Sequence, residues 1–319
     1  MRSRSPKEIP LNPIAKDLFV SETAGFSRIL VLGGAGWFGR TALAMLWQRA
    51  SEVLVVGSYE RTVAIGSLEI PIKAWDQSLI AAYKPDLVLD FAFLTRDFEQ
   101  TLGTKKFRAI NDVLSDRLLG LAHMASVQKI LTVSSGATIV QKGGSAASPL
   151  DSYGQQKLAL ETSLSDAATL TGTEVAVARA WSVSGGHVQK YQNYAFSDFI
   201  HSAVNHGFVR LRAKSLVTRR YCAVEDFLAV VMANSQGRSW LEVDSGGELV
   251  ELGDLASLIA QEVGAGSVSV VSNPRDVNLN DSYHSDNASW AGACSSARFE
   301  PLTLVEQIRN VREAFSKFY

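Results

Sequence analysis

The sequence predicts an α/β protein in which a doubly wound parallel sheet is followed by a smaller C-terminal α/β lobe. Short apolar runs, typical of buried strands, alternate with segments of helical spacing as far as about residue 180. Such alternation builds βαβ units, whose parallel strands are covered by helices on both faces. Further along, the alternation becomes irregular, with a loop and a helix over 187–207 and short strands and another helix over 209–233.

The elements of the large sheet follow one another in order. The expected strands are the apolar runs over residues 28–34, 51–58, 86–93, 129–137 and 174–183. The expected helices, recognised by apolar residues at helical spacing, cover residues 40–50, 78–84, 115–127 and 153–168. Residues 1–27 begin with basic residues that no continuous apolar segment follows, which is untypical of a secretory signal. We expect residues 1–27 to form an N-terminal extension that packs on the surface or is partly loose.

Composition narrows the class of protein. With 46% hydrophobic and 20% charged residues, the 319-residue chain has the balance of a soluble globular protein. Its formal net charge of −1 gives no general attraction to nucleic acid or to a membrane surface. No apolar stretch approaches the roughly 20 residues that span a bilayer. Two cysteines form no disulfide framework, and five histidines show no ligand spacing, so we expect a cytoplasmic protein without a metal site.

The first expected strand ends in a glycine-rich turn. Residues 29–39 read ILVLGGAGWFG, with Gly33, Gly36 and Gly39 spaced three apart. A turn of this kind between a strand and a helix lets a phosphate approach the backbone closely, and the start of the helix supplies unpaired N–H groups. The same pattern also occurs in plain βα turns that bind nothing, so the turn by itself leaves both interpretations open.

A second pattern combines hydroxyl groups with a lysine. Tyr153 and Lys157 form a Tyr-x-x-x-Lys at the start of a predicted helix, and one helical turn places both side chains on the same face. There the Lys157 ammonium can lower the pKa of the phenol, which can then exchange a proton with a substrate. Ser134 and Ser135 end the preceding strand. A solvated helix face and serines that merely cap a strand are the alternative interpretation; we favour Ser135 over Ser134.

The glycine turn, the serine pair and the Tyr-x-x-x-Lys occur in the order seen in the extended short-chain dehydrogenase/reductase family, which the chain resembles from residue 28 onward. The family's turn usually reads T-G-G-x-G-F-x-G, and here Leu32 replaces the threonine. The resemblance implies a Rossmann NAD(P)-binding domain over 28–180. It also implies a mainly substrate-binding lobe over 181–319, some of whose segments return to the Rossmann sheet. Ser135, Tyr153 and Lys157 would be the catalytic residues, and Lys157 would also hold the nicotinamide ribose.

The resemblance also implies the residues that contact the cofactor. They are Gly33, Gly36, Trp37, Phe38, Gly39, Arg40, Ser58, Arg61, Asp76, Phe91, Ala92 and Lys157. In NAD enzymes an acidic residue at the end of the second strand binds the adenosine ribose, but here Gly57 and Ser58 stand in that position. Ser58 and Arg61, helped by Arg40, suit a 2′-phosphate. The pattern favours NADP, with NAD as the alternative and a solvated loop arginine as the other interpretation of Arg61.

The family's substrates are nucleotide sugars, and the resemblance extends to their contacts. The matching positions are Thr95, Ser135, Asn193, Tyr194, Arg212 and Arg219. Arg219 matches the arginine that pairs with the nucleotide diphosphate, because a guanidinium binds phosphate oxygens with two nitrogens. Arg212 is equally well explained as surface charge. The aromatic side chain of Tyr194, next to Asn193, is equally well explained by packing. Two family positions differ: Asp90 stands in place of a histidine, and Ser182 in place of an asparagine.

Members of the family differ in the reaction that they catalyse. The 4,6-dehydratases carry an Asp-Glu pair directly after the serine or threonine, whereas this chain has Gly136 and Ala137, neither of which can transfer a proton. We therefore expect an NADP-dependent reductase of a keto-deoxy sugar nucleotide. The alternatives are a nucleotide-sugar 4-epimerase with permanently bound NAD and a non-catalytic NADP-binding sensor. The family resemblance further suggests a homodimer.

Overall fold

The computed structural model of the chain describes residues 8–47, 52–142, 152–264 and 267–318. The strands are β1 (Ile29–Leu32), β2 (Val53–Gly57), β3 (Arg61–Ile65), β4 (Leu68–Ala74), β5 (Leu87–Asp90), β6 (Lys129–Ser135), β7 (Glu174–Ala180), β8 (Val183–Ser184), β9 (Phe208–Leu211), β10 (Ser215–Ala223), β11 (Trp240–Asp244), β12 (Glu248–Glu251), β13 (Ser269–Ser272) and β14 (Asp276–Ser282).

The helices make up the rest of the regular structure. They are α1 (Pro13–Thr23), α2 (Trp37–Leu46), α3 (Gln77–Tyr83), α4 (Arg96–Leu102), α5 (Thr104–Ala122), α6 (Ala137–Lys142), α7 (Ser152–Thr171), the short 3-10 helix η1 (Tyr191–Asn193), α8 (Ala195–His206), α9 (Val224–Asn234), α10 (Leu252–Gly264), α11 (Ala288–Ala297) and α12 (Leu304–Phe318).

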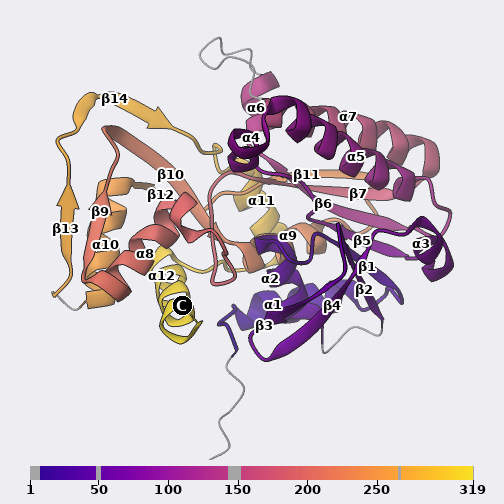
Figure 1. Cartoon of the computed structure of the whole chain (residues 1–319), viewed down its shortest axis with the longest axis horizontal. Coiled ribbons are helices and arrows are strands. Elements are labelled where there is room, and N and C mark those ends of the chain that lie inside the picture. Colours follow the sequence, from indigo (N-terminus) through magenta and orange to yellow (C-terminus); the bar gives the residue numbers. More distant parts are fainter. Residues whose placement is uncertain (1–7, 48–51, 143–151, 265–266, 319) are drawn as a thin grey trace, which may run out of the picture.

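The large sheet has the strand order β11-β7-β6-β5-β1-β2-β4-β3, and all its pairs are parallel except that of β3 with β4 (Figure 1). The middle strand, β1, pairs with both β2 and β5, and Leu32 lies opposite Val56 on one side and Asp90 on the other. The carboxyl ends of the central strands therefore meet at one edge of the sheet, which is where open α/β sheets bind ligands. This confirms the predicted fold class.

Helices cover both faces of this sheet because its central strands are apolar on both sides. All four residues of β1 are buried. On one face α3, α5 and α7 pack against the sheet, and on the other α1, α2, α9 and α11 do so (Figure 1). The C-terminal half also contributes to this sheet and its cover. Strand β11 pairs with β7, and helices α9 and α11 pack on one face.

The N-terminal segment differs from the loose or surface-bound extension that we expected. Residues 13–23 form α1, whose Ala15 and Phe19 are fully buried in the core beneath the sheet. Asn12 caps this helix, because its Oδ1 accepts a hydrogen bond from Ile14 N. Asn12 Nδ2 donates to Asp226 Oδ1 at 2.8 Å. The helix is therefore an integral part of the first domain, held to α9 by apolar contact and by a buried hydrogen bond. Residues 1–7 lie outside the described part of the chain.

The smaller lobe is built from two short sheets and three helices. In one sheet β10 lies between β12 and β14 and also pairs with β8, while β9 and β13 form the second. Helices α8, α10 and α12 share an apolar core with these strands. In Figure 1 this lobe stands beside the large sheet, and β14 runs back along β10 toward it. The lobe therefore brings residues from the end of β14 to the edge where the carboxyl ends of the large sheet lie.

Candidate active site

The glycine turn shows two different reasons for its glycines. Gly33 has φ +72°, and a Cβ atom there would lie 2.6 Å from the backbone of Phe91; one on Gly39 would lie 2.4 Å from the Gly33 oxygen. These two glycines are required by packing. A Cβ on Gly36 would meet only the Gly33 oxygen, at 3.4 Å, and φ is an ordinary −76°. Packing therefore does not demand glycine at position 36.

Gly36 is the N-cap of α2, and no side chain caps this helix. The first N–H groups of the helix, from Trp37 to Gly39, therefore have no side-chain cap. Unpaired N–H groups and the helix dipole both favour an anion at such a point. An anion is therefore favoured at the start of α2, and its assignment to a dinucleotide pyrophosphate stays a prediction.

The end of β2 and the start of β3 carry the residues that are predicted to contact the adenosine ribose. Ser58 and Arg61 are exposed, and Arg61 Nη1 contacts the Tyr59 hydroxyl at 2.6 Å, with the guanidinium 4.6 Å from the centre of that ring. Arg40 donates to the backbone oxygens of Ala35 and Ala64, so it ties the glycine turn to β3. The backbone oxygens of Ala35 in the turn and of Ala64 in the β3–β4 hairpin therefore already bind Arg40, which was predicted to help bind a 2′-phosphate.

Asp76, predicted to contact the adenine, has a different partner in the structure. Its Oδ1 accepts hydrogen bonds from Ser78 N at 2.8 Å and Leu79 N at 3.2 Å, so it caps α3.

Phe91 and Phe38 stack with ring centres 6.4 Å apart, and Ala92 N donates to the Asp90 carboxylate. The start of α2 and the end of β5 therefore contact each other at the predicted cofactor edge.

Ser135 and Tyr153 meet at the end of β6, which supports the choice of Ser135. The two hydroxyl groups are hydrogen-bonded, and Ser135 Oγ also accepts from Ala137 N at 3.2 Å. Burial raises the pKa of Tyr153, while the bond to Ser135 and the charge of Arg96 oppose this shift. Arg96 lies 5.4 Å from the centre of the Tyr153 ring. The net shift therefore favours the protonated form of the phenol.

Lys157 does not act on Tyr153 in the way that the spacing suggested. Its Nζ donates to Val133 O at 2.7 Å and lies 3.8 Å from the centre of the Phe93 ring. Burial lowers the pKa of Lys157 to about 8, and the carboxylates of Asp90 and Glu161 oppose that shift. Because Lys157 is buried against Phe93 and β6, the groups that lower the pKa of Tyr153 are Ser135 and Arg96 instead.

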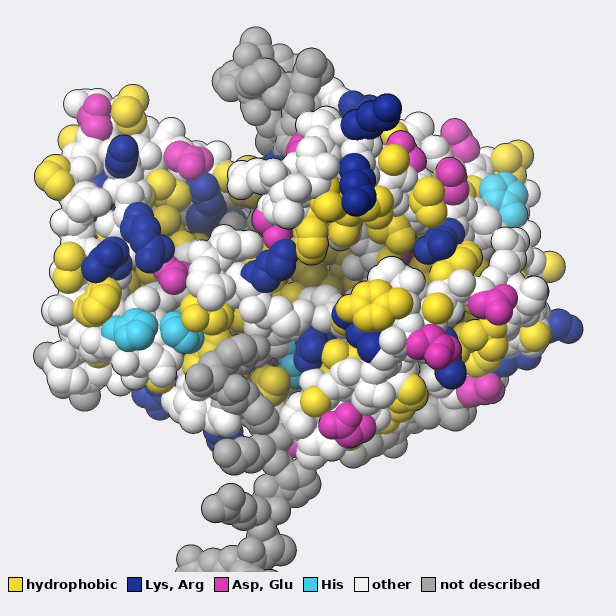
Figure 2. Space-filling model, in the orientation of Figure 1, with side chains coloured by type: hydrophobic (Ala, Val, Ile, Leu, Met, Phe, Trp, Pro, Cys, Tyr) yellow, Lys and Arg dark blue, Asp and Glu magenta, His cyan; other side chains and the backbone are white. Residues whose placement is uncertain are grey.

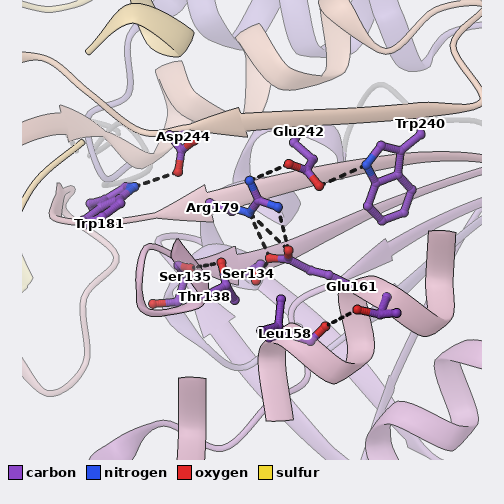
Figure 3. A network of polar contacts seen from close by, with 11 residues as sticks. Ser134, Ser135, Thr138, Leu158, Glu161, Arg179, Trp181, Trp240, Glu242 and Asp244 are labelled. Atoms are coloured by element: carbon purple, nitrogen blue, oxygen red, sulfur yellow. Dashed lines mark hydrogen bonds and ion pairs between the residues drawn. The ribbon is translucent and has the colours of Figure 1, made fainter. Parts of the chain in front are cut away.

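Ser134 belongs to a separate, buried network. Its Oγ donates to Glu161 Oε1 at 2.6 Å, and Glu161 is bound in turn by Arg179 from β7 (Figure 3). Arg179 also pairs with Glu242 on β11. Successive residues of a strand point to opposite faces, so Ser134 faces this network while Ser135 faces Tyr153.

The buried carboxylate of Asp90 was not assigned a role from the sequence. Thr132 Oγ1 donates to its Oδ2 at 2.8 Å, and burial raises the pKa of this carboxyl group. The charge of Lys157 opposes the shift. Asp90 therefore stabilises the Lys157 ammonium from the position where the family carries a histidine.

The predicted substrate residues lie on both sides of this edge. Tyr194 packs edge-on against Trp37 with ring centres 5.0 Å apart, and Asn193 ends η1 directly before it. The Thr95 hydroxyl contacts Asp97, which also pairs with Lys190. Figure 2 shows hydrophobic side chains gathered in a depression near the middle of the face where these elements meet, with Lys and Arg side chains around it.

The two predicted phosphate-binding arginines are both paired with carboxylates. Arg212 Nη1 lies 2.8 Å from Asp198 Oδ2, and its side chain is 63% exposed, which favours the interpretation as surface charge. Arg219 Nη2 lies 3.0 Å from Asp281 Oδ2, and Arg219 Nη1 donates to the backbone oxygen of Asp281 at 2.9 Å. A diphosphate at Arg219 would have to compete with Asp281.

Two aromatic residues near Ser135 were not predicted from the sequence as part of the site. Tyr283, just after β14, has its hydroxyl 3.4 Å from Ser135 Oγ and its ring centre 4.9 Å from that of Trp181. Trp181 follows β7 directly, and its position at a strand end was a usable signal. Tyr283 had none, because the pairing of β14 with β10 cannot be read from the chain.

A comparison with models of protein families shows to which family this chain belongs. The model described as the NAD dependent epimerase/dehydratase family matches residues 29–239. The chain belongs to that family. An epimerase/dehydratase-family enzyme is what the glycine turn, Ser135 and the Tyr-x-x-x-Lys indicated, and both the family and the enzyme class are thereby confirmed. A comparison with curated protein sequences gives no match.

Solved structures of similar fold include several epimerases. An epimerase from Methanothermobacter thermautotrophicus has a TM-score of 0.73 at 20% identity, over 96% of each chain. UDP-glucose 4-epimerase from Thermotoga maritima, with UDP-glucose, has 0.73 at 20%, over 91% of this chain and 99% of that one. UDP-glucose 4-epimerase from Brucella ovis, in complex with NAD, has 0.70 at 21%, over 91% and 98%. At these identities the likeness concerns the fold.

No described helix is both long and apolar enough to cross a membrane. Within the same residues, no three His, Cys, Asp or Glu side chains are grouped as a metal ion would need.

Proposed function

We propose that this chain is an NADP-dependent reductase of a keto-deoxy sugar nucleotide. The observation that carries the proposal is the hydrogen-bonded pair of Ser135 and Tyr153, which lies at the same sheet edge as the uncapped N-terminus of α2. A carbonyl oxygen placed between the two hydroxyl groups receives one hydrogen bond and one proton from them. Family membership supports hydride chemistry at this edge.

The residues divide the work of the reduction between them. When bound, the nicotinamide cofactor would supply a hydride for the carbonyl carbon. Tyr153 transfers its proton to the carbonyl oxygen, so that the C=O group becomes CH–OH, and Ser135 holds this oxygen by donating from Oγ. Arg96, 5.4 Å from the centre of the Tyr153 ring, offers its positive charge to the phenolate that remains, and the buried Lys157 would hold the nicotinamide ribose. Burial keeps the Tyr153 phenol protonated, so that its proton is present when the substrate binds.

The choice of NADP is supported by the end of β2. Gly57 and Ser58 place no carboxylate where a 2′-phosphate would lie, and a carboxylate there would repel it. Arg61 is exposed on β3 beside Tyr59 and keeps further donors for phosphate oxygens. The cofactor would leave after each turnover, as a reductase requires.

A nucleotide-sugar 4-epimerase is the second candidate, and the solved structures favour it. The Brucella ovis and Thermotoga maritima proteins of the same fold are UDP-glucose 4-epimerases. An epimerase oxidises C4 of the sugar and reduces it again with the same NAD, so it needs the same hydroxyl pair. The two candidates differ in whether the cofactor is consumed.

The test is NADPH oxidation with a panel of nucleotide-linked 4-keto-6-deoxyhexoses, in the wild type and in Tyr153→Phe. We expect turnover that falls at least about a hundredfold in the variant, because the proton donor is lost. Interconversion of UDP-hexoses without added cofactor, by protein that carries bound NAD, would favour the epimerase. A cellular activity that Tyr153→Phe leaves unchanged would favour a non-catalytic NADP-binding sensor.

A further inference from the structure

One side of Ser135 is formed by aromatic carbon. A Cβ atom placed on Gly136 would lie 2.1 Å from Trp181 Cδ2 and 2.3 Å from Cε2. The indole ring therefore lies directly against Gly136, in the volume that any side chain at this position would take. Because packed atoms do not approach so closely, Trp181 and a larger residue at 136 exclude each other.

The polar atom of the indole already has a partner. Trp181 Nε1 donates to Asp244 Oδ1 at 2.8 Å (Figure 3). The backbone nitrogen of Trp181 donates to Ser245 Oγ at 2.9 Å. An indole has a single donor and no acceptor. The half-buried ring therefore offers only carbon to a molecule beside Ser135.

Tyr283 adds a second ring to this wall. Its ring is tilted 48° to that of Trp181, with centres 4.9 Å apart, while its hydroxyl lies 3.4 Å from Ser135 Oγ. The hydroxyl groups of Ser135, Tyr153 and Tyr283 are therefore grouped at one point, and the carbon face of Trp181 lies next to it. An oxygen fits at the first place and an apolar group at the second.

We infer that Trp181 selects a 4-keto sugar that is deoxygenated at C6, so that a methyl group, not a hydroxymethyl group, meets the indole. The inference rests on the proposed function and names the substrate class of that site. A hydroxyl group against Trp181 and Gly136 would lose its water without gaining a hydrogen bond, which is costly, whereas a methyl group gains from burial. Trp181 is thus a specificity-determining residue, held in place by Asp244.

The experiment compares two nucleotide-linked 4-ketohexoses that differ only at C6, which carries either hydrogen or hydroxyl. We expect the wild type to prefer the 6-deoxy substrate in kcat/KM by at least about tenfold, the scale on which one group in a pocket discriminates. Trp181→Gln, which brings an amide to the wall, should reduce this ratio toward one. Trp181→Phe is the matched control, since it keeps an apolar ring and should keep the preference.

Binding provides a readout that does not depend on turnover. Titration calorimetry with dTDP-6-deoxyhexose and dTDP-hexose, in the presence of NADP, should show the same preference in Kd for the wild type. If neither ketohexose is reduced but the 6-deoxy ligand binds more tightly, the proposed function fails while the inference stands. Equal Kd values in the wild type, or a ratio that Trp181→Gln leaves unchanged, would overturn the inference. The wild-type comparison decides even if a Trp181 variant does not fold.

Discussion

Arg179 and Glu161 form a two-pronged ion pair in the interior of the protein. Arg179 Nη2 lies 2.6 Å from Glu161 Oε2, and Nε lies 3.0 Å from Oε1. Both side chains are almost entirely buried. Glu161 also accepts from Ser134, so the pair joins α7, which carries Tyr153 and Lys157, to β6 and β7 (Figure 3). The position of the catalytic helix relative to Ser135 therefore depends on this contact.

Breaking the pair should destabilise the whole protein. We expect Glu161→Gln to lower the free energy of unfolding by about 3–5 kcal/mol, because the Arg179 charge would remain buried with a weaker partner. Glu313→Gln is the matched control: Glu313 pairs with Lys317 on the surface, where such pairs contribute about 0.2–1 kcal/mol. Chemical denaturation measures both. Equal losses in the two variants would show that the buried pair has no special role.

The contact between Arg219 and Asp281 should compete with the substrate diphosphate. We expect Asp281→Asn to tighten binding of a nucleoside diphosphate about two- to fivefold, the size of a partly exposed ion pair. Arg219→Met should weaken binding at least about tenfold, since a charge-assisted contact is lost. Calorimetric titration with UDP and dTDP gives these values. The control is Asp276→Asn on the same strand, which should change nothing; weaker binding in Asp281→Asn would contradict the assignment.

Reduction should decline in alkaline solution. Burial lowers the pKa of Lys157 to about 8, so its ammonium charge is present below that pH and is lost above it. If that charge helps to hold the nicotinamide ribose, kcat/KM for NADPH should fall about tenfold per pH unit well above pH 8. Asp90→Asn removes a carboxylate that supports the ammonium, and it should move this decline to lower pH. A pH–rate profile that is flat to pH 10 would exclude Lys157 from catalysis.

Arg61 should determine the preference between the two cofactors. We expect Arg61→Ala to raise the KM for NADPH at least about tenfold and to leave that for NADH nearly unchanged, because only NADPH carries the 2′-phosphate. Lys73→Ala is the control, since Lys73 is also an exposed cation of the same hairpin and pairs with Glu60. Steady-state kinetics with both cofactors provide the comparison. An unchanged ratio of the two KM values would mean that Arg61 does not contact the phosphate.

The central part of the fold could be predicted because its signals are local. The apolar run of β1, the glycines after it and the helical spacing of α7 each appear within a few residues. The same locality explains the choice of Ser135: alternation along β6 sends Ser134 to Glu161 and Ser135 to Tyr153. Such features follow from backbone geometry alone.

The missed features depend on distant parts of the chain. The burial of Phe19 is set by contacts with α9, about two hundred residues away in the sequence. Lys157 was expected to act on Tyr153 because one helical turn separates them, but its direction is decided by Val133 and Phe93 on other elements. Tyr283 reaches Ser135 only through the register of β14 on β10. Tertiary packing of this kind leaves no periodic trace in the sequence.

The most direct measurement follows the hydride itself. Purified protein is incubated with NADPH deuterated at C4 of the nicotinamide and with a nucleotide-linked 4-keto-6-deoxyhexose, and the product is analysed by mass spectrometry. We expect one deuterium in each product molecule, one NADPH consumed for each, and loss of both in Tyr153→Phe. Interconversion of nucleotide sugars without deuterium uptake and without NADPH consumption would contradict the reductase.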